Sequence, residues 1–288
     1  SFVISYLLTY RVRALSVTAR AFAGGQMEER AKIRGTDEIA KLAIDFNQMA
    51  DELQEKMEQL EEHVKSQEAF TAAFAHELKT PLTSIIGYAE LLRSMSLSKE
   101  EELTAANYIF SQGKRLESLS YKLLELFVLQ KGEISFLPVN VGEAIEEVKQ
   151  ITAQGLQKKE VILEASFDEA VLLLEKDLFI SLLVNLVDNA AKASQAGGHI
   201  RLTGKCEENR YAITVRDEGK GIPESEIKNI LEPFYMVDKS RSRKEGGAGL
   251  GMTLCAEIVR LHHAEWKIES KENEGTKITI WFSLEGEE

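Results

Sequence analysis

The sequence predicts a multidomain chain with an all-α first part and an α+β second part. With 288 residues, it is long for a single domain. Hydrophobic residues recur at helical spacing over much of its first half, whereas short β-type runs alternate with helical segments after residue 140. We therefore expect a coiled-coil and four-helix-bundle dimer, followed by an α+β sandwich.

Charge and cysteine content exclude some classes of function. The formal net charge is -12 and no dense run of Lys or Arg occurs, which disfavours nucleic-acid binding because phosphate neutralisation needs a basic face. Cys206 and Cys255 lie far apart and outside any metal-binding or CxxC spacing. They are predicted to be free thiols in a reducing compartment.

The first ten residues, SFVISYLLTY, are mostly apolar, lack an initiator Met and precede Arg11 and Arg13. A membrane-spanning helix needs about 20 apolar residues. We expect residues 1–10 to be the end of a transmembrane helix, with the two arginines marking the cytoplasmic side. A buried N-terminal helix is the alternative.

A coiled-coil seam follows a glycine-bracketed polar connector. A helix over about 11–23 precedes this connector, and Thr36 is a possible N-cap for the next helix. The seam has a stutter at Leu53, which locally unwinds a supercoil. Its apolar residues, spaced three or four apart, are Ile39, Leu42, Phe46, Met49, Leu53, Met57, Leu60 and Val64.

The second helix is predicted to run to about residue 95 and to form an antiparallel hairpin with a third helix that ends near residue 132. Between them, Ser98 and Glu101 have the spacing of a capping box. Pro81 lacks a backbone N–H and is expected to bend or loosen the second helix. The apolar face of the hairpin is too broad for one partner helix, so pairing with a second hairpin in a four-helix bundle is expected.

The second part of the chain reads as an α+β layer, with Pro138 and Asn140 in the linker that precedes it. Strands are expected at 161–167, 171–175, 199–208, 210–219, 266–272 and 277–284. Helices are expected at 142–158, 177–194, 224–230 and 249–263.

Polar residues in one of these helices suggest a nucleotide site. Asn185 and Asn189 lie four residues apart and so share a helix face. The amide oxygen of Asn189 suits a hard cation such as Mg²⁺, and Lys192 can reach a phosphate. Simple polarity of the helix face is the alternative.

Two glycine-containing stretches extend this interpretation. In RDEGKGIP, Asp217 can accept a hydrogen bond from an exocyclic amine such as that of adenine, while Gly219 and Gly221 let the backbone approach a ring. A plain β-turn would also fit. In KEGGAGLGM, glycines precede a helix as in a phosphate cradle, although neither the P-loop nor the Rossmann spacing fits.

The stretch EPFYMVDKSRSRK lies between those two motifs and is polar and basic after Phe234. It is a candidate for a mobile lid over a nucleotide. Its basic residues Lys239, Arg241 and Arg243 could offer positive charge to phosphates.

Taken together and in order, these motifs resemble those of sensor histidine kinases. FAHELKTPLTSIIGY, NLVDNAAKAS, RDEGKGI, PFYMVD and GGAGLGM are similar to the H, N, G1, F and G2 boxes of that family. The run DEIAKLAIDFNQMADEL resembles a HAMP linker, although Ala14 stands where that family commonly has proline. The implied parts are the end of a transmembrane helix (1–10), a HAMP-like linker (11–60), a dimerisation and histidine phosphotransfer domain (61–133) and a catalytic ATP-binding domain (138–288).

The resemblance also implies roles for individual residues. His76 would be the phosphoacceptor, because neutral imidazole is a nucleophile near neutral pH. Glu77 would hold or accept the other ring proton of His76, and Thr80 would orient water for a phosphatase activity; a hydroxyl that only bonds back to the carbonyl of residue 76 is the alternative for Thr80. Asn189 would ligate Mg²⁺, and the expected nucleotide contacts are Asn185, Asn189, Lys192, Asp217, Gly219, Gly221, Phe234, Arg241, Gly247, Gly249, Leu250 and Gly251.

The expected function is that of the cytoplasmic part of a bacterial membrane-bound sensor kinase. A homodimer would phosphorylate itself from Mg²⁺-ATP and pass the phosphoryl group to an aspartate of a response regulator. Two alternatives are an ATPase of the gyrase or Hsp90 kind without a phosphohistidine, and a non-catalytic dimeric scaffold with a degenerate nucleotide site.

Overall fold

A computed structural model describes residues 2–130, 135–237 and 249–284. The chain divides into two compact units, Ser1–Ala72 and Ala73–Glu288. Of the expected nucleotide contacts, Arg241 and Gly247 lie outside the described residues, as do the basic side chains of Lys239 and Arg243.

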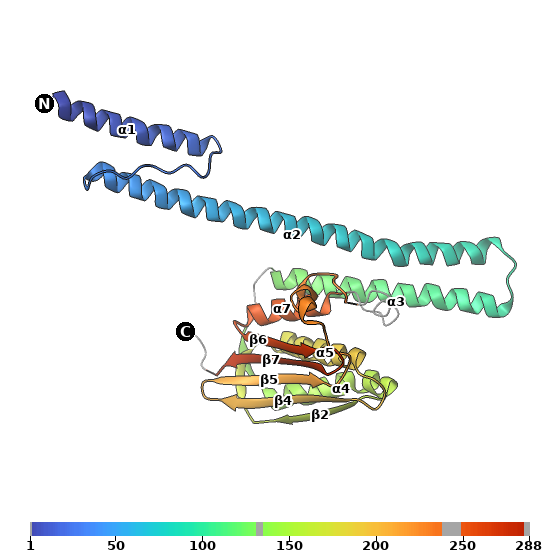
Figure 1. Cartoon of the computed structure of the whole chain (residues 1–288). Helices are drawn as coiled ribbons and strands as arrows, with labels where there is room; N and C mark the ends of the chain where they lie inside the picture. Colours follow the sequence, from blue (N-terminus) through green and yellow to red (C-terminus); the bar gives the residue numbers. More distant parts are fainter. Residues whose placement is uncertain (1, 131–134, 238–248, 285–288) are drawn as a thin grey trace. The chain divides into compact units, whose positions relative to one another are not determined.

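The first unit contains two parallel helical segments. Helix α1, Phe2–Ala23, and the start of helix α2, Glu38–Ser94, run in the same direction, and the connector between them runs back alongside (Figure 1). Asn47 fixes the connector, since its side chain accepts from the N–H of Ala31 at 2.7 Å and donates to the carbonyl of Ala31 at 3.0 Å. This helix, connector and parallel helix confirm the predicted order of elements.

The N-cap of α2 is Asp37, and the prediction of Thr36 was wrong. Asp37 Oδ1 accepts from the N–H of Ala40 at 3.1 Å, which satisfies a donor of the first helical turn. Arg11 of α1 also contacts this carboxylate at 2.5 Å. The hydrogen bond from Arg11, followed by that from Ala40, lowers the pKa of Asp37. One carboxylate therefore caps α2 and joins it to α1.

The predicted seam is mostly exposed in the single chain. Its exposed members are Leu42, Met49, Leu53, Met57, Leu60 and Val64. Phe46 is half-buried against Phe22, with ring centroids 6.0 Å apart. Across the described ranges, no helix has a stretch long and apolar enough to cross a membrane.

The second unit begins with the predicted helical hairpin. The part of α2 from residue 73 onward lies antiparallel to helix α3, Lys99–Gln130 (Figure 1). The capping box is confirmed: the N–H of Ser98 donates to Glu101 Oε2 at 2.8 Å, and the N–H of Glu101 donates to Ser98 Oγ at 3.3 Å. Helix α2 continues through Pro81 without interruption.

An ion pair lies between the two hairpin helices. Arg115 Nη2 of α3 donates to Glu77 Oε2 of α2 at 2.7 Å, and the two side chains are only 10% and 7% exposed. Nearer the turn of the hairpin, about three helical turns from Glu77 and two from Arg115, the rings of Tyr88 and Tyr108 stack with centroids 4.7 Å apart. Large apolar residues remain exposed on the hairpin, among them Leu82, Ile86, Leu103, Phe110, Leu124 and Phe127.

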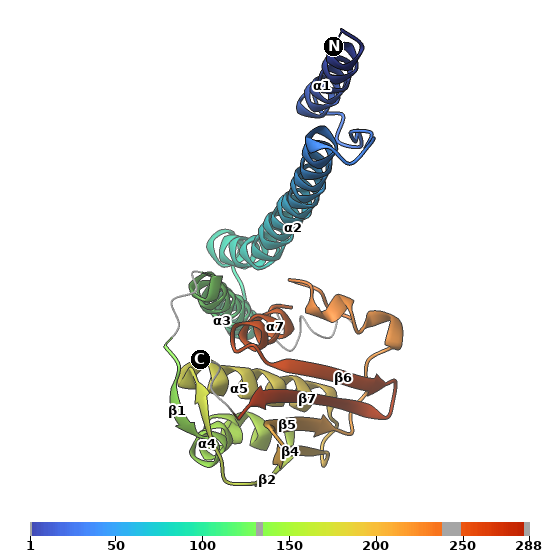
Figure 2. The same cartoon turned by 90° about the vertical axis from the view of Figure 1, so that its left-hand side faces the viewer.

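The C-terminal domain is built on a five-stranded mixed sheet in the order β2-β4-β5-β7-β6. Its strands are β2 (Ile162–Phe167), β4 (His199–Glu207), β5 (Arg210–Asp217), β6 (Glu265–Lys271) and β7 (Gly275–Ser283). The β2–β4 pair is parallel and the other pairs are antiparallel. Along one face of this sheet lie α4 (Val141–Lys159), α5 (Lys176–Ala193) and α7 (Gly251–Leu261), as Figures 1 and 2 show.

Two local predictions were wrong. The supposed linker at Pro138 and Asn140 belongs to strand β1, Leu137–Asn140, which pairs antiparallel with β3, Val171–Leu174. The helix predicted at 224–230 is instead two 3₁₀ turns, η1 (Glu224–Glu226) and η2 (Asn229–Leu231). The run is short, and it ends at Glu232, whose backbone is extended. Pro233 follows, and a proline disfavours helical geometry in the residue before it.

The core of this domain lies between the sheet and the helices. Asn140 caps α4 by accepting from the N–H of Glu143 at 3.1 Å.

Both cysteines are free thiols, as predicted. Cys206 is exposed, whereas burial raises the pKa of Cys255 to about 12. Fully buried side chains include Ile145, Phe179, Leu182, Leu183, Ile200, Leu202, Tyr211 and Phe282.

We predict that Arg115→Met destabilises the hairpin by about 3–5 kcal/mol, because the substitution removes the guanidinium from a buried ion pair with Glu77. Urea unfolding followed by circular dichroism measures the change in free energy of unfolding. The control is Arg93→Met, whose pair with Glu90 is 3.7 Å long and exposed, and which should change stability by about 0.5 kcal/mol or less. Equal effects of the two substitutions would contradict the prediction.

Candidate nucleotide-binding site

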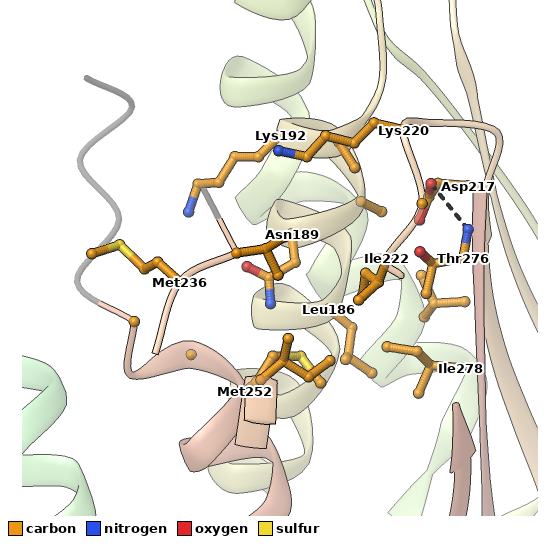
Figure 3. A pocket seen from close by; sticks show the side chains of 18 of the residues that line it. Leu186, Asn189, Lys192, Asp217, Lys220, Ile222, Met236, Met252, Thr276 and Ile278 are labelled. Atoms are coloured by element: carbon orange, nitrogen blue, oxygen red, sulfur yellow. Dashed lines mark hydrogen bonds between the residues drawn. The ribbon is translucent and has the colours of Figure 1, made fainter. Parts of the chain in front are cut away.

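A cavity of about 220 Å³ lies between α5, the end of β5, the start of β7 and the start of α7 (Figure 3). One side carries apolar groups suited to a flat ring, and polar groups gather around them. Its lining includes Lys122, Leu186, Asn189, Lys192, Asp217, Lys220, Gly221, Ile222, Met236, Gly249, Gly251, Met252, Thr276 and Ile278.

Asp217 is the buried anion of this cavity. It ends strand β5 and is 5% exposed. Its Oδ1 accepts from the N–H groups of Gly219 at 2.8 Å and Thr276 at 3.3 Å, and Figure 3 shows the second of these bonds. Burial raises the pKa of Asp217, while the two backbone hydrogen bonds act in the opposite direction. Among the described residues no donor is found for Oδ2, so a buried acceptor is left for a ligand.

Three glycines let backbone segments close around Asp217. A Cβ on Gly219 would lie 2.5 Å from the carbonyl oxygen of Ala193 in α5. Gly221 and Gly275 have φ of +66° and +104°, and a Cβ on either would lie within 2.1 Å of a backbone oxygen, of Lys271 and Asp217 respectively. Larger residues would push apart the strands that hold the carboxylate.

Asparagine and lysine side chains form the other polar end of the cavity. Asn189 and Lys192 of α5 line it (Figure 3), and Asn185 lies one turn earlier. Asn185 Nδ2 donates to the carbonyl of Ser181 at 2.9 Å, so its Oδ1 faces outward to accept from Lys122 Nζ at 3.2 Å. Burial first, and then the nearby charge of Lys192, lower the pKa of Lys122.

Phe234 and Gly249 meet at the rim of the cavity. The N–H of Phe234 donates to the carbonyl of Gly249 at 2.8 Å, and both residues have positive φ, +65° and +70°. A Cβ on Gly249 would lie 2.6 Å from the carbonyl carbon of Phe234, so only glycine fits this approach. Leu250 is fully buried beneath it. The ring of Phe74, two residues before His76, lies 6.4 Å from that of Phe234.

The expected catalytic residues lie on α2. His76 is exposed, as a phosphoacceptor must be. Thr80 Oγ1 donates to the carbonyl of His76 at 3.3 Å, which is the alternative weighed for this residue. The carboxylate of Glu77 is buried and paired with Arg115. Its predicted action on the ring of His76 stays a prediction.

Family models match three successive segments of the chain. Residues 3–55 match the HAMP domain, residues 66–132 the His Kinase A (phospho-acceptor) domain, and residues 175–286 the histidine kinase-, DNA gyrase B- and HSP90-like ATPase. The chain belongs to the sensor histidine kinases. Most of the residues that line the cavity lie in the segment that matches the ATPase model.

Curated relatives of the kinase align along nearly its whole length. The sensor histidine kinase YkoH of Bacillus subtilis is 31% identical over 291 residues, which cover 98% of this chain and 62% of that protein. The sensor histidine kinase MtrB of Mycobacterium leprae is 32% identical over 289 residues, which cover 98% of this chain and 51% of that one. The chain thus spans about half to three-fifths of the length of these relatives.

Solved structures have the same fold. The histidine kinase ThkA, in complex with the response regulator protein TrrA, aligns with a TM-score of 0.63 and 23% identity over 79% of this chain and 66% of that one. The Acinetobacter baumannii histidine kinase AdeS aligns with a TM-score of 0.59 and 18% identity over 73% of this chain and 98% of that one.

The structure brings most of the predicted nucleotide residues of the kinase together. Asn189, Lys192, Asp217 and three glycines line the cavity, while Asn185, Gly219, Phe234 and Leu250 lie just behind this lining or at the rim. Sequence reasoning missed Thr276 and Gly275, although the turn NEGT before the last strand was a usable signal. It also missed Lys122, because nothing in the local sequence shows that α3 reaches this cavity.

The polar end of the cavity also has the donor set that Mg²⁺ would need beside a nucleotide. No group of three or more His, Cys, Asp or Glu side chains able to hold a metal occurs among the residues described. The amide oxygens of Asn185 and Asn189 are hard ligands, and Mg²⁺ usually completes its shell with phosphate oxygens and water.

We predict that Asp217→Asn changes how stability depends on pH. The folded kinase holds a proton on Asp217 more tightly than the unfolded chain does, because burial raises this pKa above 3.8. Stability contributed by the proton is therefore present at low pH and is lost as the pH rises above about 3.8. The amide that replaces the carboxyl group cannot ionise, so the variant should gain stability relative to the parent between about pH 4 and pH 7.

Urea unfolding of both proteins across that range measures this difference. Its control is Asp168→Asn, at a carboxylate that accepts from the N–H of Cys206 at an exposed site. The prediction is contradicted if the free energy of unfolding changes with pH equally in the parent and in Asp217→Asn.

Proposed function

We propose that this chain is the cytoplasmic catalytic portion of a membrane-bound bacterial sensor kinase. It phosphorylates His76 from Mg²⁺-ATP and passes the phosphoryl group to an aspartate of a response regulator. The buried, unpaired Oδ2 of Asp217 is the observation that carries this proposal, because among the described residues it gives the cavity a specific acceptor for the adenine amine.

The cavity orients the nucleotide from its two ends. Asp217 takes the adenine amine, and the ring packs among the apolar side chains of Leu186, Ile222, Met252 and Ile278. The triphosphate would then extend toward Asn189 and Lys192, which lie on the side of the cavity away from Asp217 (Figure 3). Asn189 would hold Mg²⁺ through its amide oxygen, and the ion would neutralise charge on the phosphates. Arg241 would belong to the expected lid over them, and Gly247 to the hinge of that lid.

His76 accepts the phosphoryl group through a neutral ring nitrogen. Its exposure on α2 supports this role, and its place two residues after Phe74 puts it on the helix that contacts the rim of the nucleotide site. Phosphoryl transfer depends chiefly on positioning and on charge neutralisation, so what α2 must supply is an accessible imidazole. For Glu77 to hold or accept the other ring proton of His76, as we propose, its carboxylate would have to turn from Arg115 toward the ring.

A homodimer is the proposed assembly. The exposed seam of the first unit and the exposed apolar face of the hairpin both need a cover, and a second copy of the chain offers the same two surfaces. In that arrangement residues 61–133 form the dimerisation and phosphotransfer domain, residues 11–60 the HAMP-like linker and residues 138–288 the catalytic domain. The segment at 1–10 joins the linker to the membrane.

We predict that His76→Gln abolishes labelling of the chain by γ-³²P-ATP and Mg²⁺, because the variant lacks the nucleophilic nitrogen. Acid-labile label on the parent, read by gel autoradiography, is the measurement. His63→Gln is a matched control, since His63 is also an exposed histidine of α2, and it should keep parental labelling. An unlabelled parent, or a labelled His76→Gln variant, would refute the proposed phosphoacceptor.

We further propose a phosphatase activity that uses Thr80. Its hydroxyl lies one turn beyond His76 on the same helix and holds only a long bond of 3.3 Å to the backbone, so it can turn toward a water molecule. The water would attack the phosphoaspartate of the regulator.

We predict that Thr80→Ala keeps autophosphorylation within about twofold but slows regulator dephosphorylation by about tenfold or more, a typical loss for one positioned group. The substrate is a receiver domain that the parent phosphorylates in a transfer screen. Thr71→Ala is the control, because Thr71 Oγ1 makes the same backward bond to Gln67 at 2.8 Å. If both variants dephosphorylate the receiver at the parental rate, Thr80 has no such role.

A further inference from the structure

Helix α3 of the hairpin contacts the catalytic domain through two polar side chains. Lys122 Nζ donates to Asn185 Oδ1 at 3.2 Å, and Glu125 Oε1 accepts from Ser181 Oγ at 2.5 Å. The two residues of α3 are three apart and their partners on α5 are four apart, so one turn of α3 faces one turn of α5. Helix α3 also lies against α7 (Figures 1 and 2). The two hydrogen bonds therefore fix which turn of α3 packs against which turn of α5.

Lys122 enters the nucleotide cavity at its asparagine end. It is one of the lining residues, although it comes from the hairpin and not from the ATPase fold. A Cβ built on Gly251 would lie 3.3 Å from Asn185 Oδ1, 3.7 Å from Asn189 Nδ2 and 3.7 Å from Lys122 Nζ. The ammonium and both amides thus meet at the first residue of α7, where the helix dipole favours negative charge.

The positive charges at the asparagine end of the cavity favour binding of an anion. Lys192 lies close enough to Lys122 to repel it, and this repulsion is larger than the attraction of Lys122 to either nearby carboxylate, Asp188 or Glu125. Over the described ranges no carboxylate forms an ion pair with Lys122, and its hydrogen-bond partner is a neutral amide. A half-buried ammonium held this way is costly. A ligand that brings negative charge between the two lysines would convert that cost into attraction.

We propose that Lys122 binds the phosphate chain of the nucleotide, so that the hairpin supplies a cation to the nucleotide site of its own chain. This inference rests on the proposed nucleotide binding. A flexible ammonium is well suited to phosphate oxygens, which accept from many directions. Mg²⁺-ATP carries a net charge of about −2, which the two lysines together would neutralise.

The contact also links nucleotide binding to the position of α3. If phosphates bind Lys122 only while α3 lies against α5, then a bound nucleotide holds α3 in this register, and the same contact raises nucleotide affinity by an equal factor. An opposing role for Lys122 would be competition with Mg²⁺ for the amide oxygens of Asn185 and Asn189. The two roles predict affinity changes of opposite sign.

The test is calorimetric titration of the full chain with Mg²⁺-ATP, Mg²⁺-ADP and adenosine. Lys122→Met should weaken ATP and ADP binding by about tenfold, the usual effect of one charged hydrogen bond, and leave adenosine binding unchanged. Lys122→Arg keeps the charge and should retain most of the affinity. Lys114→Met is the matched control: it removes a charge from an exposed position of the same helix, where Lys114 pairs with Glu117.

The outcomes separate the possible failures. Unchanged or tighter binding of ATP and ADP by Lys122→Met would overturn the inference, and tighter binding would assign competition with Mg²⁺ to this lysine. An equal loss for adenosine would also overturn it, since the effect would then be structural. A parent that binds none of the three ligands would overturn the proposed function itself, and this inference with it.

Discussion

A carboxylate held away from water is the constraint on which the catalytic domain depends. Asp217 ends a central strand, and burying its charge carries a cost that two backbone N–H groups offset in part. To bring those donors close, the chain must turn sharply on both sides, which only glycine permits at 219, 221 and 275. The strands, turns and helix α5 thus converge on one oxygen that, among the described residues, remains free to accept from a ligand. Local stability is given up in order to form a specific site.

The hairpin presents the opposite arrangement, with its polar contact inside and apolar groups outside. Glu77 and Arg115 fix the register of α2 against α3, because a buried pair is strongly destabilised when either partner is displaced. The outer face, with residues such as Leu103 and Phe110 exposed, is left without cover by the single chain. The register of α2 against α3 is therefore set within one chain. The apolar outer face is buried only when two chains associate, so association supplies the hydrophobic free energy of the bundle. An assembly of this kind can rearrange without unfolding its hairpins.

The sequence predicted what depends on local pattern and failed where a contact joins distant segments. Heptad spacing predicted α2, the spacing of Ser98 and Glu101 predicted the hairpin turn, and ordered motifs predicted the cavity. Pattern alone could not assign the N-cap to Asp37, because that choice also depends on Arg11 of another helix. Nor could it show that the stretch around Pro138 pairs with β3, since β1 has only four residues and no alternation to read. Pairing partners of very short strands are set by tertiary packing.

Lys122 illustrates the same limit at the functional site. On α3 it follows Tyr121 and precedes Leu123, and nothing in that order separates it from a surface lysine. Its meaning comes from the contact of α3 with α5, which places a hairpin cation beside the amides expected to serve Mg²⁺. Because the hairpin completes the nucleotide site, the affinity for nucleotide and the position of α3 against α5 depend on each other. Any signal that moves α3 would then change nucleotide affinity, and loss of nucleotide would in turn release α3.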